Sequence, residues 1–314
     1  MPENDRWRIV FMGTPEFALP SLSALANSGD EVVLTVTQPD RPRGRGRKLA
    51  PPPVKILAEE LGLPVLQPEK IREPGLVSRL EVLEPDLFVV VAYGQILTSA
   101  LLDLPRVGPL NVHASLLPAY RGPAPINWAI INGETETGVT TMFMAQGVDT
   151  GPTLLSRPLQ IEETDTAGIL HDRLSHLGAE ILIETITGLK AGTVSPQPQP
   201  ETGVSHAPLL TKSDGLLDWK RPAIELAGLV RGLDPWPGAR TTFQGRRLKL
   251  FGGRVGSVRG QPGQVMGLER GRLHIAAGEG SLMVAELQLA GQKRLKAVDF
   301  WHGQRLNAAS ILGN

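Results

Sequence analysis

Short apolar segments alternate with helical patterns over the first 144 residues, and this alternation constrains the fold more than any other feature. The segments are nearly continuous in apolar character, which is typical of strands buried on both faces. The predicted strands are Arg8–Met12, Glu31–Thr37, Leu87–Ala92, Gly108–Val112 and Val139–Met144. Three helices are predicted. The first begins at Pro15 and is stopped by Gly29, and the other two span Val54–Leu61 and Ala124–Ile131. This order predicts a doubly wound α/β domain with a parallel sheet.

A long helix and a proline-rich segment end this region. Apolar residues recur at helical spacing from Thr166 to about Leu189, which predicts one amphipathic helix. Residues 191–203 then carry proline at alternate positions, a composition typical of an extended linker. Beyond it, glycines break up short strand-like runs, which predicts a small all-β barrel or sandwich. The runs are Arg247–Phe251, Leu273–Ala276 and Leu282–Leu287.

The two regions differ in charge, although the whole chain is neutral. Residues 204–314 contain 16 Lys and Arg against 8 Asp and Glu, a charge of +8, and residues 1–203 carry −8. A basic region of this kind indicates a polyanionic partner, and an uneven surface charge without a partner is the alternative.

Other features of the composition exclude whole classes of protein. Cysteine is absent, which rules out disulfides, thiolate metal sites and a cysteine nucleophile. The longest apolar run, Leu87–Ala92, is far shorter than the roughly 20 residues of a membrane helix. Residues 1–5 are polar and acidic, unlike a secretory signal. These features together favour a soluble cytosolic protein.

Two polar residues lie at the end of the fourth predicted strand. Asn111 and His113 are two residues apart, so they face the same side of an extended chain. In an open α/β sheet, ligands bind beyond the carboxyl ends of the strands. The pair is therefore either a hydrogen-bonded structural pair or an amide donor beside a titratable imidazole in an active site.

Asp149 follows the next predicted strand. Asp-Thr-Gly is an ordinary turn sequence, so this residue alone has a structural explanation. In combination, an Asn that stabilises an oxyanion, a His that titrates near neutrality and an Asp that orients it would serve acyl-type transfer.

Other kinds of site are disfavoured. A dinucleotide site needs G-x-G-x-x-G after the first strand, where only Gly13 is present, and no Walker A sequence occurs. The other five histidines lack metal-ligand spacing, so we expect no metal site. They are His171, His176, His206, His274 and His302.

A strongly basic segment follows the second predicted strand. Five of the eight residues from Arg41 to Lys48 are basic, and the interspersed prolines and glycines are expected to forbid regular structure. The segment is either a solvated connector or a clamp for the phosphates of nucleic acid.

Several short stretches carry a resemblance to a known family. They are Phe11–Phe17, Gln38–Pro42, Asp86–Leu97, Asn111–Pro118, Arg121–Pro123, Gly147–Gly151, Leu217–Trp219 and Asp234–Pro237. The chain resembles the 10-formyltetrahydrofolate-dependent formyltransferases, and within them the methionyl-tRNA formyltransferases. The resemblance is dense up to residue 151 and sparse after residue 237. The element Asn-x-His-x-Ser-Leu-Leu-Pro with its downstream Asp is specific to the group, whereas the basic segment points to the tRNA-acting members.

The resemblance implies a Rossmann-like N-terminal formyltransferase domain and a smaller all-β, OB-like C-terminal domain. We expect a formyl-folate-binding catalytic domain in residues 1–190, a Pro-rich linker in 191–206 and a tRNA-binding barrel in 207–314. The implied formyl donor is 10-formyltetrahydrofolate and the implied partner is initiator methionyl-tRNA. We expect no metal, no membrane and a monomer. No role is implied for the tail after Lys296.

The resemblance also implies roles for individual residues. Asn111, His113 and Asp149 match the catalytic trio. The residues that match folate-binding segments are Ser115, Leu116, Leu117, Pro118, Gln95, Ile96 and Leu97. Those that match contacts with the acceptor or its tRNA are Gly13, Thr14, Arg41, Arg43, Arg45, Arg47 and Lys48.

The implied reaction moves the formyl group from N10 of the folate to the α-amino group of methionine on tRNA. Asn111 and His113 would stabilise the oxyanion, and Asp149 would hold the imidazole or a water that relays the proton. Two alternatives stay open: a formyltransferase that acts on a small amine or on water, and a non-catalytic folate- or tRNA-binding module. The basic segment and the +8 region weigh against the first, and the intact trio weighs against the second.

Overall fold

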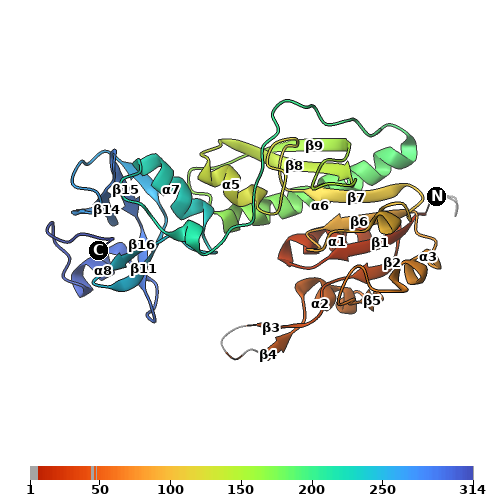
Figure 1. Ribbon diagram of the computed structural model, residues 1–314, viewed down its shortest axis with the longest axis horizontal. Helices are drawn as coiled ribbons and strands as arrows, with labels where there is room; N and C mark the ends of the chain where they lie inside the picture. The colour runs from red at the N-terminus through yellow and green to blue at the C-terminus, as the bar shows by residue number, and fades with distance from the viewer. Residues whose placement is uncertain (1–5, 44–45, 47, 314) are drawn as a thin grey trace. The chain divides into compact units, whose positions relative to one another are not determined.

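A seven-stranded sheet with the strand order β5-β2-β1-β6-β7-β8-β9 organises the N-terminal region (Figure 1). The computed structural model describes residues 6–43, 46 and 48–313. The strands are β1 (Arg8–Gly13), β2 (Glu31–Val36), β5 (Val65–Leu66), β6 (Leu87–Val91), β7 (Gly108–His113), β8 (Glu136–Phe143) and β9 (Thr153–Gln160). The strands from β5 to β7 pair in parallel, whereas β8 is antiparallel to β7. The sequence does not predict this reversal, because a strand buried on both faces has the same apolar pattern in either direction.

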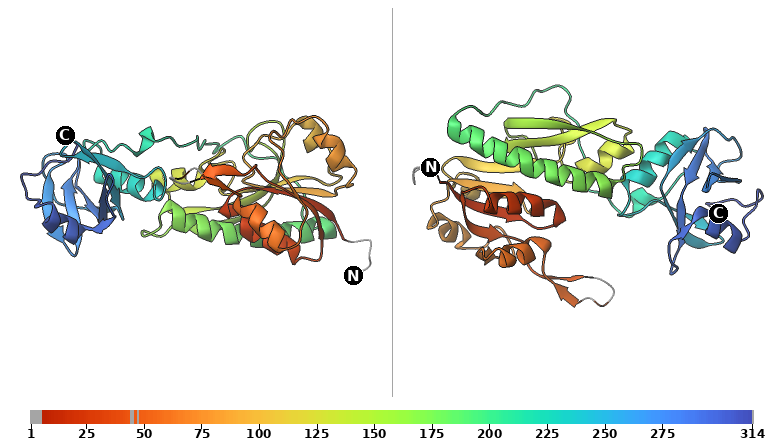
Figure 2. Two further views of the ribbon diagram at one scale, coloured as in Figure 1. Left: turned by 90° about the horizontal axis from the view of Figure 1, so that it is seen from below. Right: turned by 180° about the vertical axis from the view of Figure 1, so that it is seen from behind.

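Helices cover both faces of this sheet. They are η2 (Glu16–Ala18), α1 (Leu19–Ala26), α2 (Pro53–Glu60), α3 (Leu76–Glu81), α4 (Ser99–Leu102) and α6 (Ala167–Ala191). α1 and the long α6 lie against one face (Figure 2, right). On the other face, Leu80 of α3 and Leu101 of α4 pack with Val10 and Phe88 in one buried core. Within the described part of the chain, no helix is long and apolar enough to cross a membrane.

The basic segment after β2 forms a hairpin. β3 (Arg41–Arg43) and β4 (Lys48–Ala50) are antiparallel, with Pro42 opposite Leu49. The prediction that proline and glycine forbid regular structure here is therefore wrong. A two-stranded ladder has two outer edges, so a proline can occupy a position whose N–H would otherwise point to solvent. The predicted residues Arg45 and Arg47 lie outside the described residues.

Two four-stranded antiparallel sheets form the C-terminal region, with the orders β10-β11-β16-β17 and β12-β15-β14-β13. Their strands are β10 (Arg240–Phe243), β11 (Arg246–Phe251), β12 (Arg254–Gly256), β13 (Val265–Glu269), β14 (Arg272–Ala276), β15 (Ser281–Val284), β16 (Glu286–Leu289) and β17 (Leu295–Lys296). The predicted strand Leu282–Leu287 is in fact two strands of different sheets. The chain crosses between them at Ala285, whose N–H donates to the carbonyl of Phe251. η3 (Ser213–Gly215), α7 (Ala223–Gly232) and α8 (Ala297–Gly303) complete the region.

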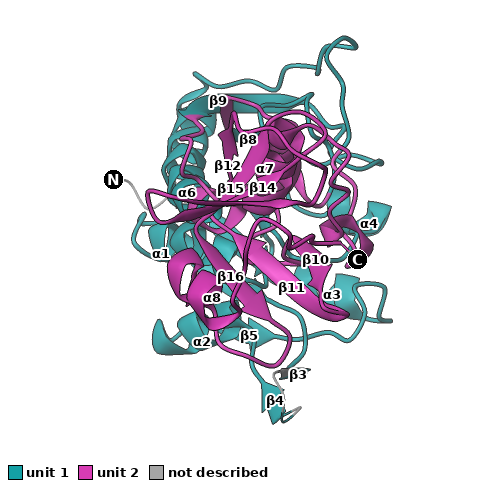
Figure 3. Ribbon diagram, turned by 90° about the vertical axis from the view of Figure 1, so that its left-hand side faces the viewer, with its two compact units in different colours: residues 1–122, 138–159, 171–206 teal, residues 123–137, 160–170, 207–314 magenta. Residues whose placement is uncertain are grey.

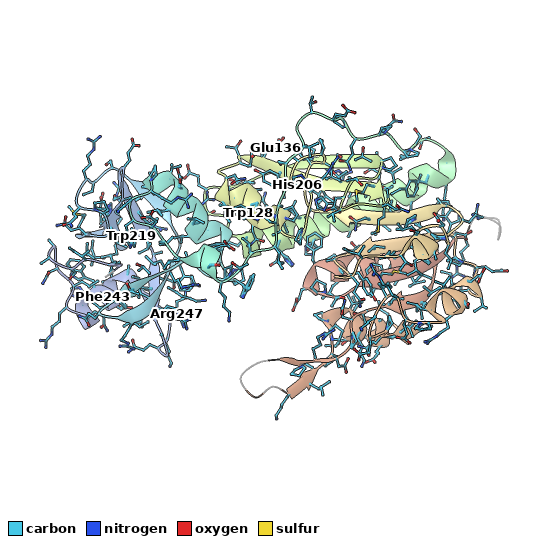
Figure 4. The ribbon with its side chains drawn as sticks, viewed as in Figure 1. Trp128, Glu136, His206, Trp219, Phe243 and Arg247 are labelled. Atoms are coloured by element: carbon cyan, nitrogen blue, oxygen red, sulfur yellow. The ribbon has the colours of Figure 1, made fainter. Side chains whose placement is uncertain are left out.

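The chain forms two compact units that interleave in sequence (Figure 3). Unit 1 comprises residues 1–122, 138–159 and 171–206, and unit 2 comprises residues 123–137, 160–170 and 207–314. α5 (Pro125–Ile131) therefore belongs to unit 2. Its Trp128 and Ile131 pack against a buried core that contains Trp219 and Phe243. Figure 4 labels Trp128, Trp219 and Phe243 among the side chains. The linker segment up to residue 206 belongs to unit 1.

Candidate active site

The carboxyl ends of β1, β6 and β7 lie side by side at one edge of the sheet of unit 1. The strand order reverses here, because β2 pairs with one side of β1 and β6 with the other. Gly13 allows β1 to approach β6, since a Cβ atom there would lie 2.8 Å from the ring of Phe11 and 3.1 Å from the carbonyl oxygen of Val91. Ligands of open α/β sheets bind at such a reversal of strand order.

His113 ends β7, and its imidazole is only 7% exposed. Its Nε2 lies 3.0 Å from the carbonyl oxygen of Tyr120, which can only accept, so Nε2 carries the proton. Its Nδ1 lies 3.6 Å from Oδ2 of Asp149. Burial lowers the pKa of His113, although the charge of Asp149 and the Tyr120 carbonyl act in the opposite direction. At neutral pH the ring is therefore uncharged, with a lone pair on Nδ1 facing the carboxylate.

Asp149 lies on the loop between β8 and β9. Its φ of 53° is in the left-handed region, which Asp tolerates better than most residues. Its Oδ2 accepts a hydrogen bond of 2.8 Å from the backbone N–H of Gly122. Two residues later, only glycine fits, because a Cβ on Gly151 would lie 1.8 Å from the carbonyl oxygen of Phe143. The Gly151 end of the loop therefore packs closely against β8, and the bond to Gly122 directs the carboxylate at the imidazole.

Asn111 lies on β7, beside Val90 of β6. Its Nδ2 donates to the carbonyl oxygen of Val90 over 3.0 Å. Its Oδ1 is buried and has no hydrogen-bond partner among the described residues. A buried acceptor left unsatisfied costs about 1–3 kcal/mol. An amide that bears this cost beside His113 is suited to binding a group that the protein itself does not supply.

The segment Ser115–Pro118 follows β7 and is fixed by Thr140 of β8. Thr140 is fully buried; its Oγ1 donates to the carbonyl of Ser115 over 2.8 Å and accepts from the N–H of Leu117 over 3.2 Å. Ser115 itself donates to the carbonyl of Ala119. The backbone of the predicted folate segment is therefore held from both sides.

The second predicted folate segment, Gln95–Leu97, follows β6. The side-chain oxygen of Gln95 accepts from the N–H of Ile71 over 2.7 Å, and Leu97 is buried. Ile96, between them, is 73% exposed. The segment is anchored on both sides of an apolar side chain that the protein does not cover.

The end of β1 is connected to the basic hairpin through Gln38. Thr14 donates its Oγ1 to the carbonyl of Tyr93 over 2.8 Å, and Gln38 donates to the same carbonyl over 3.3 Å. Arg41 in turn donates to the side-chain oxygen of Gln38 over 3.4 Å. Lys48 is exposed on the second strand of the hairpin, and Arg43 contributes its backbone to the first.

Asp40 fixes the root of the hairpin. The Lys55 ammonium lies 3.0 Å from both carboxylate oxygens, and Gln67 donates to Oδ1 over 2.8 Å and to the carbonyl of Gln38 over 2.9 Å. The hydrogen bonds from Gln67 and Lys55 hold the pKa of Asp40 below its ordinary value. The hairpin is thus anchored at its base.

The linker segment runs along the loops that carry Tyr120 and Asp149. Gln199 donates from Nε2 to the carbonyls of Asp149 and Gly151, both over 2.8 Å, and its oxygen accepts from Arg121. Ser205 accepts the N–H of Tyr120 on its Oγ and the N–H of Arg121 on its carbonyl, each over 2.9 Å. Sequence reasoning missed both linker residues and Thr140, because no local pattern separates them from ordinary polar residues.

The structure thus brings Asn111, His113 and Asp149 together. Among residues 6–43, 46 and 48–313, no group of three or more His, Asp or Glu side chains is placed to hold a metal ion.

Comparison with known families accounts for nearly the whole chain. Residues 7–186 match the model of the formyl transferase family, and residues 209–305 match the model of the formyl transferase C-terminal domain. The chain belongs to the formyl transferase family. This bears out the resemblance, and the observed architecture bears out the predicted fold class.

Curated members of the formyl transferase family align with the chain from end to end. The methionyl-tRNA formyltransferase of Geobacter metallireducens is 53% identical over 306 residues, 98% of each chain. That of Pelobacter propionicus is 54% identical over 305 residues, 97% of this chain and 96% of its own.

Solved structures of low sequence identity share the formyl transferase fold. HypX from Aquifex aeolicus in complex with tetrahydrofolic acid has a TM-score of 0.62 at 19% identity, over 95% of this chain and 48% of its own. WlaRD, a sugar 3N-formyl transferase, has a TM-score of 0.66 at 16% identity, over 91% of this chain and 99% of its own. At this identity the likeness concerns the fold alone.

Proposed function

We propose that the chain transfers the formyl group of 10-formyltetrahydrofolate to the α-amino group of initiator methionyl-tRNA, in the cytoplasm, for translation initiation. The observation that carries this is the His113–Asp149 pair beside the unsatisfied Asn111, in a chain that aligns end to end with methionyl-tRNA formyltransferases. Residues 1–190 supply the catalytic domain, 191–206 the linker and 207–314 the domain that binds tRNA.

In this proposal His113 takes the proton from the attacking amine. An α-amino group has a pKa of about 8, so part of it is neutral and nucleophilic at pH 7. Because Nε2–H is engaged by the carbonyl of Tyr120, Nδ1 is the nitrogen that can accept a proton. The Asp149 carboxylate, 3.6 Å away, stabilises the imidazolium that forms.

Formyl transfer then proceeds through a tetrahedral intermediate. The amine nitrogen bonds to the formyl carbon, whose oxygen becomes an oxyanion, and the amine proton moves to Nδ1 of His113. Collapse of the intermediate breaks the bond between the formyl carbon and N10, and N10 takes the proton from the imidazolium. The products are tetrahydrofolate and formylmethionyl-tRNA, with His113 neutral again.

Asn111 serves the groups that change during this reaction. Its unsatisfied Oδ1 accepts an N–H of the amine, and its second Nδ2 hydrogen donates to the oxyanion. Loss of one oxyanion donor typically lowers the rate by about 10²–10³-fold.

The two anchored loops bind the donor. Ser115–Pro118 and Gln95–Leu97 follow neighbouring strands, and the exposed Ile96 offers an apolar surface to a flat ring such as the pterin. No polar group of the chain competes for Oδ1 of Asn111 among the described residues. The site is thus suited to a ligand that supplies both an apolar ring and a polar reacting group.

The acceptor end of the tRNA contacts Gly13, Thr14 and the basic hairpin. Arg41, Arg43 and Lys48 lie on the described strands of this hairpin, and the sequence between these strands contains Arg45 and Arg47. Together with the +8 charge of residues 204–314, these residues favour a polyanionic acceptor over a small amine.

The test is formylation of charged initiator tRNA with and without 10-formyltetrahydrofolate. We expect formylmethionine only when the donor is present. A dTDP-amino sugar and glycinamide ribonucleotide serve as competing acceptors, and a higher kcat/KM for either would contradict the proposal. Light scattering on the purified protein tests the expected monomer.

A further inference from the structure

We infer that Gln199, a residue of the linker, is a positioning residue that fixes the Asp149 loop against the imidazole of His113. The inference rests on the proposed function only in that His113 and Asp149 are the proton-transferring pair. Gln199 reaches neither ring nor carboxylate of that pair; it acts through the backbone that carries them.

The amide of Gln199 uses its whole hydrogen-bonding capacity on the two loops of the site. Both Nε2 hydrogens are engaged by carbonyls of the Asp149 loop, and Oε1 accepts two hydrogen bonds from Arg121, of 3.1 and 2.6 Å. Arg121 lies between Tyr120, whose carbonyl holds His113, and Gly122, whose N–H holds Asp149. One side chain therefore connects the loop that orients the imidazole with the loop that orients the carboxylate.

The linker presents Gln199 in a fixed register. Gln197 and Thr153 exchange two backbone hydrogen bonds of 2.8 Å, and further along Ser205 bonds to Tyr120 and Arg121. Gln199 lies between these two attachments, so its backbone is fixed on both sides. An extended connector does not require these hydrogen bonds, so they indicate that the linker has a further structural role.

The loop that Gln199 holds has few other constraints near the carboxylate. Asp149 and Gly147 both have positive φ, of 53° and 120°, and the carboxylate bonds to the N–H of Gly122. Without Gln199, the carbonyls of Asp149 and Gly151 lose their side-chain donor and the loop can relax. A displacement of about 1 Å at a catalytic group can cost about 10²-fold in rate.

Gln197 supplies a matched control. It is the same residue type two positions away in the same proline-rich segment, but within the described part of the chain its exposed side chain donates only to Ser195, over 3.1 Å. Its truncation removes the same atoms without touching either loop.

The first experiment compares Gln199→Ala, Gln199→Met and Gln197→Ala in the full-length protein. We expect both Gln199 variants to lower kcat by about 10- to 100-fold, with KM for donor and tRNA within about twofold of wild type. Gln197→Ala stays within about twofold in all three constants. Gln199→Met keeps the length of the side chain, so it carries the test if Gln199→Ala does not fold. Equal behaviour of the Gln199 and Gln197 variants would overturn the inference.

A second readout separates positioning from loss of structure. Asp149 is the charged group that faces His113, and its charge raises the pKa of the imidazole, so displacing it moves the NMR titration of His113 to lower pH. We expect this shift in Gln199→Ala and its absence in Gln197→Ala. An unchanged titration would overturn the inference even if activity fell. The titration needs no acceptor, so it remains valid if formylation of methionyl-tRNA fails.

A third variant asks whether Gln199 acts through Asp149. In an Asp149→Asn background, single-turnover rates should fall little further on Gln199→Ala, because the residue being positioned is already impaired. If the rate decreases of the two single variants multiplied fully in the double variant, Gln199 would act elsewhere and the inference would be contradicted.

Discussion

The basic hairpin and the linker both contain proline and glycine, and the sequence predicts irregular backbone in each, but they lie in very different environments. Residues 41–50 contain five Arg and Lys and one proline, whereas residues 191–206 contain three prolines and no Arg or Lys. Among the described residues, the strands of the hairpin pair only with each other, in a two-stranded sheet, and Leu49 on it is 71% exposed. The polar groups of the linker bond to the loops that hold His113 and Asp149.

The different environments of the two segments show that composition alone leaves one question open. It indicates whether a segment can form its own core, but not whether the protein supplies partners for its polar groups. A segment poor in apolar residues cannot form its own core, but its backbone and polar side chains still need partners. Whether water or the rest of the protein supplies them depends on where the fold places the segment. We therefore expect linker substitutions to change kcat and hairpin substitutions to change the KM for tRNA.

The largest effect sets the upper limit for the linker. Replacing the group that the linker holds, in Asp149→Asn, removes the charge that stabilises the imidazolium, and kcat should fall by at least about 10²-fold. His113→Ala should do the same. Steady-state kinetics measure kcat, and a separate binding assay measures the affinity for tRNA. Turnover near that of wild type in either variant would remove that residue from the mechanism.

Ser205→Ala should have a smaller effect through the second linker attachment. The variant leaves the N–H of Tyr120 without its acceptor, at a cost of about 1 kcal/mol in unfolding free energy. Tyr120 also holds His113 through its carbonyl, so a loss of the same size in transition-state stabilisation lowers kcat about fivefold. Ser195→Ala is the matched control, since its Oγ only accepts from the side chain of Gln197. Equal kinetics for the two variants would place Ser205 outside the catalytic effect.

Removing two cations from the hairpin should affect binding and not turnover. In Arg41→Ala with Lys48→Ala, we expect KM for tRNA to rise several-fold and kcat to stay unchanged. Each lost phosphate contact should also flatten the dependence of log affinity on log salt by about 0.7–0.9. Arg79→Ala, an exposed arginine on α3, is the control. A fall in kcat at saturating tRNA would show that the hairpin acts on the chemistry as well.

The smallest effect concerns the root of the hairpin and is lost in acid. The pKa of Asp40 is lowered by its bonds to Gln67 and Lys55, so its stabilisation is fully present above the ordinary value of 3.8 and is lost as pH falls through the folded value. The difference in unfolding free energy between wild type and Asp40→Asn should therefore be constant above about pH 5 and shrink below about pH 4. A difference that grows in acid would contradict this assignment.

The sequence predicted the elements whose burial follows from a local apolar pattern. The strands around Ile9, Val89 and Leu110 and the helix from residue 167 show apolar patterns that depend only on their own residues. It also placed Asn111 and His113 at the end of a strand. The combination of Asn111, His113 and Asp149 was inferred from their residue types and positions and was also implied by the family resemblance, and their catalytic roles remain predictions.

What the sequence could not predict depends on contacts between distant segments. The side chains of Thr140 and Gln199 form hydrogen bonds with backbone groups far away in the chain, and the sequence around each residue does not indicate these partners. The crossing at Ala285 was missed for the same reason, because the strands on both sides of it are apolar and only the sheets they join distinguish them.

The interleaving of the two units has a consequence for how such a protein can be rearranged. The chain passes from one unit to the other five times, at residues 122, 137, 159, 170 and 206. A gene segment cut at the linker would therefore separate the C-terminal sheets from Trp128 and Ile131, which pack against their core. Recombination at this boundary would leave the hydrophobic core of the C-terminal sheets incomplete, so exchange of this region is expected to require residues 123–137 as well.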